Sequence, residues 1–523
     1  MPEKKYLVGV DCGTTSSRTV IFDFKGTMIG YGQVMNPLTY PGVGRVECDG
    51  PALIETLYES TRRALQATEI DPEEIAGISF DMFRGTMMTR DAEGGFTHPI
   101  MIWQDLRGAE VLQLMADKLA AKGMSLADHY DLCGMPLGTV ASSTRLVWLM
   151  ENKPELYAQA TRIHTVMGLL TGAYGADDYY DDLNDTPWLT LNDETFQYSP
   201  KICDAFGVDM DKLAPLRQSG QIIGQVTPQV AAATGLAVGT PLVMGTGDQQ
   251  SGCLGCGCVS EGMGYACGGT AGITAGKSAK LLRDPERKCY IVGTPDGIYE
   301  LESQSNAAGS AFKWVKQEFC DVEELTARYL GLEVYDFLTQ AAKKSPPGAN
   351  GVFFLPYLSG AYTPHYDENA RGTFTGFTFA HTRNDLVRAT MEGVCFDIKD
   401  LLTAMVDANV PDYSVIRLTG GISRSEFWCQ MQADIYNRPC ETVECEEATA
   451  LGCAMVAAVG VGVYKDFAEA AQNMVQVKRR YEPDPAVVER YEDAYQTWKG
   501  LFDALHGEAF DSVTAFQEKY RDR

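Results

Sequence analysis

A carboxylate, a glycine, four hydroxyls and an arginine stand close together near the start of this chain. The segment Asp11–Arg18 reads Asp-Cys-Gly-Thr-Thr-Ser-Ser-Arg and lies between two β-prone runs, Leu7–Val10 and Thr19–Phe24. The tip of such a hairpin offers backbone N–H groups and hydroxyls to an anion, and its aspartate can hold a hydrated Mg²⁺. Arg18 adds N–H donors that suit phosphate oxygens. The pattern indicates phosphate binding, with an ordinary β-turn as the alternative.

A similar strand–turn–strand pattern recurs more than two hundred positions later. Residues Gly262–Gly276 place Gly268-Gly269-Thr270 between two β-prone runs. Shortly before them, the apolar run Pro241–Gly245 leads into Thr246-Gly247-Asp248. A third glycine turn, Thr419–Ser425, follows a short apolar run and precedes a helical pattern. Each turn is a weak signal by itself, but in this order they predict two halves that close on one nucleotide.

The elements around the first turn follow a known order. Three β-prone runs come first, then a helical pattern opened by Pro51, and then the strand Ala76–Phe80. This order is the core of the ribonuclease H-like fold. A similar order restarts near residue 247, so we expect one domain at 1–246 and a second at 247–523. The further elements expected are helices at 106–121, 142–151, 154–160, 306–319 and 385–405, with Asn384 as N-cap of the last, strands near 262–267, 273–277, 290–292 and 299–303, and C-terminal helices after Pro483.

Length and composition fit a globular protein of two domains. A chain of 523 residues exceeds a single compact core, and apolar residues make up 45% of it and charged residues 22%. The net charge of −26 argues against a nucleic-acid partner, which favours a basic surface. The sequence has no uninterrupted apolar stretch of about 18 residues and no apolar leader, so we expect no membrane partner and a cytoplasmic location.

The cysteines suit a reducing compartment, because there are 15 of them without regular spacing. Cys253, Cys256 and Cys258 cluster within Ser251–Val259, with Cys267 nearby, and so could suggest a metal site. Structural zinc generally takes two ligand pairs separated by a loop, and this cluster does not match that spacing. Small residues surround these cysteines, so we expect close backbone packing there rather than a metal.

The ordered set of motifs resembles the FGGY family of carbohydrate kinases over essentially the whole chain. Residues 372–377 and 385–392 are similar to its C-terminal signature, with Phe377 where an aliphatic residue is more usual. An earlier signature is matched loosely within 142–151, where Arg145 stands in place of the typical lysine. The resemblance implies an α/β protein with two ribonuclease H-like domains, of the actin and sugar kinase superfamily, and a cleft between them.

The resemblance also implies roles for the turn residues. Asp248 is then the catalytic base that takes the proton from a substrate hydroxyl, and a turn-capping aspartate is the alternative. Asp11 and Asp248 become the carboxylates near Mg²⁺, and ATP is the expected phosphate donor. The residues expected to contact ATP are Thr14, Thr15, Ser16, Arg18, Gly269, Thr270, Gly309, Lys313, Gly421 and Ser425.

Substrate recognition departs from the family pattern. Many members carry Gly-Gln-Met-His-Gly after the fourth strand, whereas this chain has Asp81-Met82-Phe83-Arg84-Gly85. Arg84 has donors only, which favours an acceptor-rich or anionic substrate group, and a salt bridge with Asp81 or Asp105 is the alternative. Trp103–Arg107 does fit the family's Trp-x-Asp-x-Arg, with Trp103 as an apolar wall and Asp105 as a hydroxyl acceptor. The residues expected to contact the substrate are Met82, Phe83, Arg84, Trp103, Asp105, Asp248 and Gln249.

These inferences favour an ATP-dependent kinase that phosphorylates a hydroxyl of a small sugar or polyol, such as a xylulose- or ribulose-like compound. An autoinducer-2 kinase-like enzyme is the alternative, because 247–255 and 447–454 look like that group. Such kinases have an Arg-Glu pair where this chain has Phe83-Arg84, which counts against it. A non-catalytic, actin-like nucleotide-dependent regulator is expected to lose Asp11 or Asp248, and this chain keeps both. The oligomeric state stays open, with a homodimer among the options.

Overall fold

The computed structural model describes residues 3–184, 191–192 and 194–520. The chain forms two compact units, and neither unit is one continuous stretch of sequence. The first unit contains Met1–Ser260, Ser278–Glu300 and Glu447–Gln476. The second contains Glu261–Lys277, Leu301–Glu446 and Val477–Arg523. The expected domain boundary between residues 246 and 247 stays a prediction.

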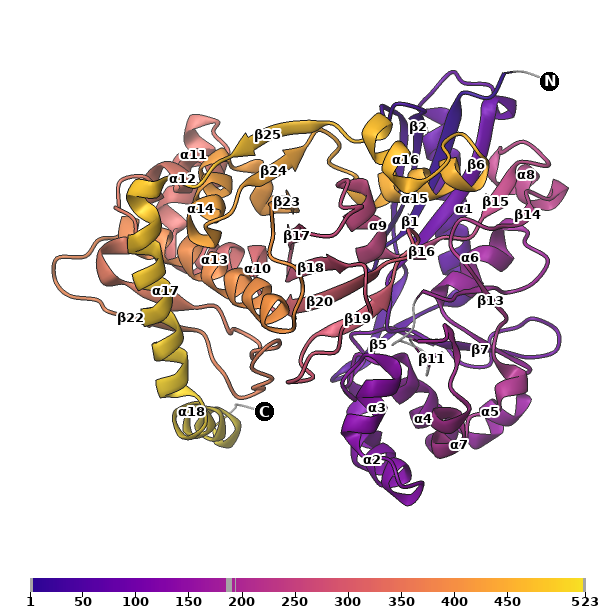
Figure 1. Cartoon of the computed structure of the whole chain (residues 1–523), viewed down its shortest axis with the longest axis horizontal. Coiled ribbons are helices and arrows are strands. Elements are labelled where there is room, and N and C mark those ends of the chain that lie inside the picture. Colours follow the sequence, from indigo (N-terminus) through magenta and orange to yellow (C-terminus); the bar gives the residue numbers. More distant parts are fainter. Residues whose placement is uncertain (1–2, 185–190, 193, 521–523) are drawn as a thin grey trace. The chain divides into compact units, whose positions relative to one another are not determined.

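A mixed β-sheet forms the centre of the first unit (Figure 1). Its strands run in the order β14-β15-β6-β1-β2-β3, and β16 also pairs with β6. The strands β1 (Tyr6–Cys12), β2 (Ser16–Asp23) and β3 (Met28–Met35) form an antiparallel meander, and β6 (Ile75–Met82) lies parallel to β1. The predicted order of three strands, a helix and a strand is thereby confirmed.

Helix α1 (Gly50–Gln66) connects the meander to β6 and begins near the predicted start. Its N-cap is Asp49, which accepts a bond from the backbone N–H of Ala52 at 2.9 Å, and Pro51 lies in the first turn. The helix contacts β2 and β3 and buries Leu53 and Leu57 completely. Each of these leucines contributes about 1.5–3 kcal/mol by leaving water.

Two helices distant in sequence pack on each other and on this sheet. Helices α9 (Asp248–Gly255) and α15 (Ala448–Gly460) are in contact, and α15 also contacts β1 and β6 (Figure 1). Their glycines allow the approach, because a Cβ at Gly255 would lie 1.7 Å from the carbonyl oxygen of Ala448. A Cβ at Gly452 would lie 1.9 Å from that of Ser251. The expected small-residue packing is confirmed, with Cys253, Cys256 and Cys258 buried in this segment.

Shorter elements complete the first unit. The expected helix at 106–121 begins as the 3₁₀ segment η2 (Leu106–Val111) and continues as α2 (Leu112–Ala121). The sequence analysis does not predict the hairpin of β4 (Leu38–Gly42) and β5 (Arg45–Cys48), because β4 is mostly exposed and has no buried apolar face. The other elements are η1 (Pro72–Glu74), β7 (Met88–Arg90), β8 (Ile100–Met101), α3 (Leu126–Cys133), α4 (Ser142–Asn152), α5 (Pro154–Gln159), β9 (Arg162–His164), α6 (Val166–Tyr174), β10 (Asp181–Asp182), β11 (Leu191–Asn192), β12 (Gln197–Tyr198), α7 (Pro200–Phe206), η4 (Met210–Lys212), β13 (Leu216–Arg217), β14 (Ile222–Gln225), α8 (Pro228–Thr234), β15 (Pro241–Val243), β16 (Thr246–Gly247), β19 (Tyr290–Gly293) and α16 (Phe467–Met474).

The second unit has a sheet of its own, in which β20-β18-β17-β23-β24-β25 lie side by side. The strands β17 (Met263–Gly268) and β18 (Gly272–Ser278) form an antiparallel hairpin, and β23 (Val415–Thr419) lies parallel to β17. β1, β2 and β6 have the same relation in the first unit, so the two units share a local pattern. Further elements are β20 (Tyr299–Ser305), α10 (Gly309–Phe319), α11 (Asp321–Leu330), α12 (Val334–Ala342), η5 (Ala349–Gly351), β21 (Phe353–Leu355), β22 (Thr373–Thr375), η6 (Gly421–Arg424), α14 (Glu426–Tyr436), β24 (Cys440–Val443) and β25 (Val477–Tyr481).

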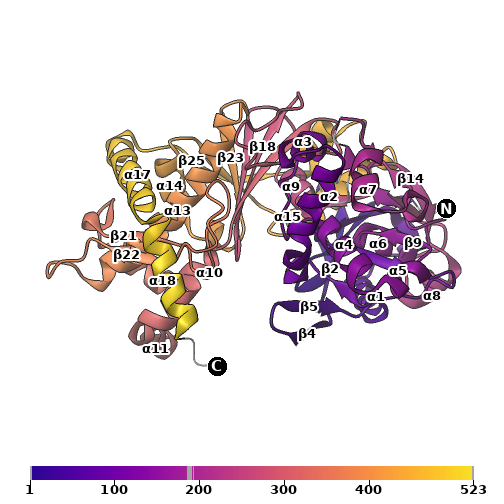
Figure 2. The same ribbon diagram turned by 90° about the horizontal axis from the view of Figure 1, so that it is seen from below.

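The helix α13 (Arg383–Asp407) runs through the second unit (Figure 2). The sequence analysis names Asn384 as its N-cap, and this is wrong. The N-cap is Thr382, whose N–H and hydroxyl both donate to Asp385 Oδ2, at 2.7 and 2.9 Å. In this capping box, the threonine and the acidic residue three positions later bond to each other and so bind N–H groups at the helix start. Asn384 lies inside the first turn and cannot take this role.

Two C-terminal helices, α17 (Pro485–Leu505) and α18 (Glu508–Lys519), confirm the prediction for the residues after Pro483. Helix α17 packs back on α13, where Arg388 Nη2 donates to the hydroxyl of Tyr491 at 2.7 Å. Among the described residues, no helix combines the length and the apolar character needed to cross a bilayer.

Candidate active site

The turn between β1 and β2 is fixed by side chains on both sides. Arg18 Nη1 donates to Asp11 Oδ2 at 2.9 Å, and these two residues are paired opposite each other on β1 and β2. The side-chain amide of Asn36 donates to the carbonyl oxygens of Gly13 at 2.6 Å and Thr14 at 3.2 Å. Because these carbonyl oxygens already accept bonds from Asn36, the N–H groups and hydroxyls at the tip of the turn are the groups that can bind an anion.

The hydroxyls of this turn differ in exposure. Thr15 is exposed and Thr14 is half-buried, so both lie where a ligand can reach them. Ser16 is buried, and its Oγ accepts a bond from the side-chain amide of Gln33 at 2.8 Å. Contacts of Thr14, Thr15, Ser16 and Arg18 with ATP stay predictions. The hydroxyls of Ser16 and Thr14 already accept bonds, from Gln33 and from Trp103.

Asp11 lies in β1 and Asp248 directly follows β16, and both of these strands pair with β6. Asp11 of β1 pairs with Asp81 of β6, and Asp81 pairs with Thr246 of β16. Asp248 follows β16 directly and is the first residue of α9. The three carboxylates therefore come from one end of one sheet, within the first unit. A base and a metal carboxylate that serve one reaction need this kind of neighbourhood.

Asp11 and Asp81 form a buried pair of carboxyls. Their side chains hydrogen-bond to each other, and Cys453 Sγ donates to Asp81 Oδ2 at 2.8 Å. Burial raises the pKa of both acids, and the charge of Asp11 raises the pKa of Asp81 further, well above its ordinary value. Arg18 counteracts the shift of the pKa at Asp11. Of the two acids, Asp11 is therefore the one whose charged form is favoured, because Arg18 pairs with it.

Asp182 lies beside Thr246 and leads to a prediction for stability. Its carboxylate accepts a bond from Ser219 Oγ at 3.0 Å, yet burial raises its pKa to about 7. The folded state therefore keeps this proton up to about pH 7, whereas the unfolded chain releases it near pH 4. The resulting stability is full below pH 4 and is lost as the pH rises through 7. We expect Asp182→Asn to gain about 2 kcal/mol in free energy of unfolding, relative to the parent, between pH 5 and pH 7. Denaturant unfolding at both pH values measures this gain, and a difference that does not change with pH contradicts it.

Arg84 reaches the predicted catalytic base. Its Nε lies 3.6 Å from Asp248 Oδ1, and its side chain is 6% exposed against 28% for that of Asp248. A Cβ at Gly247 would lie 2.5 Å from Arg84 Cδ, so the glycine makes room for the arginine stem. The sequence analysis names Asp81 and Asp105 as alternative partners, and the ion pair in the structure is with Asp248.

Met82 and Phe83 are part of the core of the first unit. Met82 is fully buried, and its sulfur accepts a bond from the backbone N–H of Met167 at 3.0 Å. Phe83 is 2% exposed and belongs to the same apolar cluster. Gln249 is half-buried in the first turn of α9, next to Asp248. Substrate contacts of Met82, Phe83 and Gln249 stay predictions, and Gln249 is the one that neighbours the base.

The loop that carries Trp103 and Asp105 contacts the phosphate turn. Trp103 Nε1 donates to Thr14 Oγ1 at 2.8 Å, so the predicted sugar wall touches a predicted ATP ligand. Asp105 is fully buried, and its carboxylate accepts bonds from the N–H of Val46 at 2.8 Å and from the Arg107 guanidinium at 2.7 and 2.9 Å. Burial opposes ionisation, yet these bonds hold the pKa of Asp105 below its ordinary value. Asp105 therefore anchors the loop, and its contact with a substrate hydroxyl stays a prediction.

In the second unit, the glycine turn between β17 and β18 contacts the start of α10. The N–H of Gly309 donates to the carbonyl of Gly269 at 2.8 Å, and Ser310 Oγ donates to the carbonyl of Thr270 at 2.7 Å. A Cβ at Gly309 would lie 2.6 Å from the Gly269 oxygen, so this approach requires glycine. Three predicted ATP ligands, Gly269, Thr270 and Gly309, thus lie together at a helix N-terminus, which suits an anion.

The other predicted ATP ligands of this unit lie on α10, η6 and α14. Lys313 is exposed on α10. A Cβ at Gly421 would meet nothing within 4 Å, so the space beside it is open. Ser425 is the N-cap of α14, and its side chain accepts a bond from the first turn of that helix. A Cβ at Gly420 would lie 2.6 Å from the Gly268 backbone, so the turns after β17 and β23 meet at one end of the sheet.

Comparison with known proteins identifies the family. The N-terminal domain of the FGGY family of carbohydrate kinases matches residues 6–255, and its C-terminal domain matches residues 265–461. The chain belongs to the FGGY family. Members of this family are phosphotransferases that act on hydroxyl groups of sugars, with ATP as the phosphate donor. The predicted family, enzyme class and α/β fold are thereby confirmed.

Similar FGGY proteins match this chain nearly end to end. Autoinducer-2 kinase from Escherichia coli (strain K12) is 30% identical over 505 residues, which are 95% of this chain and 94% of that protein. Xylulose kinase from Bacillus subtilis (strain 168) is 27% identical over 504 residues, which are 95% and 97% of the two chains. The crystal structure of ligand-bound xylulose kinase from Lactobacillus acidophilus has a TM-score of 0.87 at 23% identity and covers 97% of this chain and 99% of that one. The FGGY fold therefore extends along the chain.

Sequence reasoning missed three side chains that build this candidate site. Asn36 binds the turn carbonyls, Asp81 pairs with Asp11, and Cys453 binds Asp81. Asn36 lies in no motif, and Cys453 comes from α15, so only the folded chain brings them here. Asp81 did carry a signal, because a carboxylate at the end of a continuously apolar strand needs a buried partner.

Proposed function

We propose that this FGGY chain is an ATP-dependent kinase that phosphorylates a hydroxyl of a small sugar or polyol of the xylulose or ribulose kind. One observation carries the proposal: the backbone places Asp11 and Asp248 at the same end of one sheet. Arg18 lies on the same hairpin as Asp11. Phosphoryl transfer needs a carboxylate beside the metal of the nucleotide and a base beside the acceptor hydroxyl. The 27% identity to the B. subtilis xylulose kinase supports the substrate class.

Each residue then has one task. Asp248 takes the proton of the acceptor hydroxyl, and Arg84, whose Nε lies 3.6 Å away, orients that carboxylate. The hairpin tip with Arg18 and the turn at Gly269–Thr270 bind phosphate oxygens through N–H groups and hydroxyls. Trp103 gives the sugar an apolar wall.

Asp11 and Asp248 are the residues that would hold a hydrated Mg²⁺. The donor set fits this ion, because Mg²⁺ takes one or two carboxylates together with waters and nucleotide phosphates. Asp11 is suited to the task because Arg18 favours its charged form, whereas the pKa of Asp81 is raised further. When bound, the ion spreads the charge of the phosphoryl group during transfer.

A kinase for the autoinducer-2 precursor, 4,5-dihydroxypentane-2,3-dione, is the second candidate. The 30% identity to E. coli autoinducer-2 kinase over 505 residues favours it. The pair Phe83-Arg84 counts against it, since Phe83 is buried in the core and only Arg84 neighbours Asp248.

A coupled assay for ADP release tests both candidates. Pentuloses, hexuloses, polyols and the dione are compared at equal ATP, and ADP released without an acceptor is subtracted. We expect a pentulose or a polyol to give the highest kcat/KM, at least about tenfold above the dione. The reverse order would establish the second candidate, and release of ADP that no acceptor stimulates would contradict both.

Arg84→Gln tests what the arginine recognises. A guanidinium donates strongly to a carbonyl oxygen, which can only accept, whereas a polyol hydroxyl can both accept from the glutamine NH₂ and donate to its amide oxygen. We expect the ratio of kcat/KM for a ketose to that for the matching polyol to fall about tenfold, the equivalent of about 1.4 kcal/mol. The matched control is Arg62→Gln, on the outer part of α1, which is expected to leave the ratio unchanged. An equal loss on both substrates would assign Arg84 to Asp248 alone.

A further inference from the structure

Arg145 is a buried arginine of α4 whose guanidinium binds backbone carbonyls of two segments. It is fully buried, and five carbonyl oxygens accept bonds from it. Its Nε donates to Ile102 at 2.8 Å, and its Nη2 donates to Trp103 at 2.5 Å and Asp105 at 3.2 Å. Its Nη1 donates to residues 140 and 141 at 3.3 and 3.2 Å. Five N–H groups in a rigid fork are a donor set that arginine alone provides.

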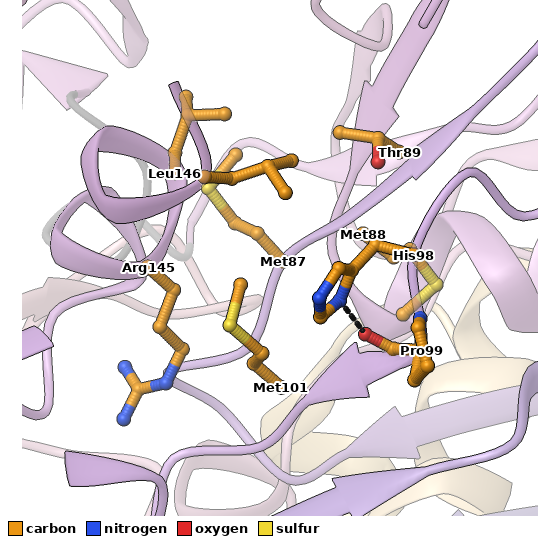
Figure 3. Close-up of a pocket in the computed structure, with 9 residues that line it drawn as sticks. Met87, Met88, Thr89, His98, Pro99, Met101, Arg145 and Leu146 are labelled. Carbon is orange, nitrogen blue, oxygen red and sulfur yellow. Dashed lines mark hydrogen bonds between the residues drawn. The ribbon is translucent and has the colours of Figure 1, made fainter. Parts of the chain in front are cut away.

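Apolar side chains also lie beside Arg145. Figure 3 shows its side chain beside Met101, with Met87 and Leu146 nearby. The cavity that these residues line has a volume of about 10 Å³, which is room for one water at most. A sugar does not fit there, so the guanidinium serves the chain itself. Burying a charge is costly, and such a group is retained where it selects one backbone arrangement.

The carbonyls that Arg145 binds belong to the loop of Trp103. Asp105 anchors the other side of this loop through the N–H of Val46, at 2.8 Å. Trp103 in turn donates its indole N–H to Thr14 Oγ1 at 2.8 Å. A continuous line of direct bonds therefore runs from α4 through the loop to the phosphate turn, all within the first unit.

We propose that Arg145 is a positioning residue for substrate binding. It fixes the backbone of residues 102–105, and the fixed backbone holds the Trp103 indole against Thr14. The proposal rests on the proposed function, in which Trp103 forms a wall for the acceptor. A loosened loop turns the indole away from its place, which weakens acceptor binding more than the chemical step.

Arg145→Lys is the test variant, because lysine keeps the charge and has three donors in place of five. Arg145→Gln, without the charge, is the second variant if the first does not fold. The matched control is Arg90→Lys in the same unit. Arg90 is 5% exposed and donates to His164 and to the carbonyl of Gly94, which lie outside residues 102–105. The control therefore reproduces the loss of a buried guanidinium without touching the loop.

The first readout needs no substrate. The indole N–H signal of Trp103, in the full chain labelled with ¹⁵N-tryptophan, is assigned by its loss in Trp103→Phe. We expect Arg145→Lys to shift this signal and to speed its hydrogen exchange at least about tenfold, because the bond to Thr14 is no longer held. Arg90→Lys is expected to leave it unchanged. An unchanged signal in the folded Arg145 variant overturns the proposal, even if its melting temperature falls.

The second readout separates acceptor binding from turnover. For the best acceptor of the parent enzyme, we expect Arg145→Lys to raise the acceptor KM about tenfold and to leave kcat and the KM for ATP within about twofold. Arg90→Lys is expected to keep all three within about twofold. A matching loss of kcat in both variants indicates a purely structural role and overturns the proposal. If the parent phosphorylates no acceptor, the proposed function fails, and the Trp103 signal alone then decides for or against this inference.

Discussion

Asp248→Asn is expected to lower kcat for sugar phosphorylation by about 10³-fold, since a general base contributes roughly 10²–10⁴-fold. The amide keeps the shape of the carboxylate but cannot take the proton of the acceptor hydroxyl. Asp248 is the first residue of α9, and Arg84 lies 3.6 Å from its Oδ1, so the side chain is held where it begins the helix. The measurement is ADP release at saturating ATP and acceptor, together with the nucleotide Kd from calorimetry without Mg²⁺, which we expect to change less than about threefold.

The control for this variant is an aspartate with a purely local task. Asp248 also accepts a bond from the backbone N–H of Gln249 at 2.9 Å, so a turn-capping role has to be measured separately. Asp91 caps a turn in the same unit and accepts bonds from the N–H groups of Glu93 at 3.1 Å and Gly95 at 2.7 Å. We expect Asp91→Asn to lower stability slightly and to leave kcat unchanged. If Asp248→Asn loses no more activity than Asp91→Asn, the base lies elsewhere.

Gly255→Ala is expected to destabilise the first unit by about 3 kcal/mol or more, because one methyl group has no space between α9 and α15. The new Cβ would lie 1.7 Å from the carbonyl oxygen of Ala448, a backbone atom that cannot turn aside. The two helices must therefore separate, and the contact of α15 with β1 and β6 loosens with them. Thermal melting of the full chain is the measurement, with an expected loss of about 5–10 °C.

The same substitution at an open position is expected to have the opposite sign. Gly500 lies inside α17, is exposed, and a Cβ there would meet nothing within 4 Å. Gly500→Ala is expected to stabilise by about 0.5–1 kcal/mol, because alanine loses less backbone entropy in a helix. A Gly255→Ala variant that melts at or above the temperature of Gly500→Ala would show that α9 and α15 are not packed as described.

Local patterns were sufficient for most of the elements that carry the site. Alternating and continuous apolar runs predict β1, β2, β3 and β6, because strands in a covered sheet need buried side chains along their length. The strand β4, which is mostly exposed, has no such pattern. The sequence analysis misplaces the start of α13 because a capping box depends on two residues acting together, Thr382 and Asp385, and not on one favourable N-cap type.

The candidate site was predictable where motifs are contiguous in sequence. Asp11 and Arg18 face each other because the hairpin register requires it, and a hairpin can be read from local sequence. The partnership of Asp81 with Cys453 depends on α15 lying against β6, a packing between residues hundreds of positions apart. The same holds for the pairing of Arg84 with Asp248. Spacing along one chain does not specify such contacts, so these residues needed the fold.

The division of the chain has a consequence for biosynthesis. β1 is translated well before α15, the helix that lies against it in the folded unit. At a translation rate of about 5–20 residues per second, α15 is synthesised roughly 20–90 seconds after β1. During that interval the apolar side of β1 and β6 faces the nascent chain and the solvent. The N-terminal half of this kinase, cut off before α15 is translated, is therefore expected to need a chaperone or to aggregate.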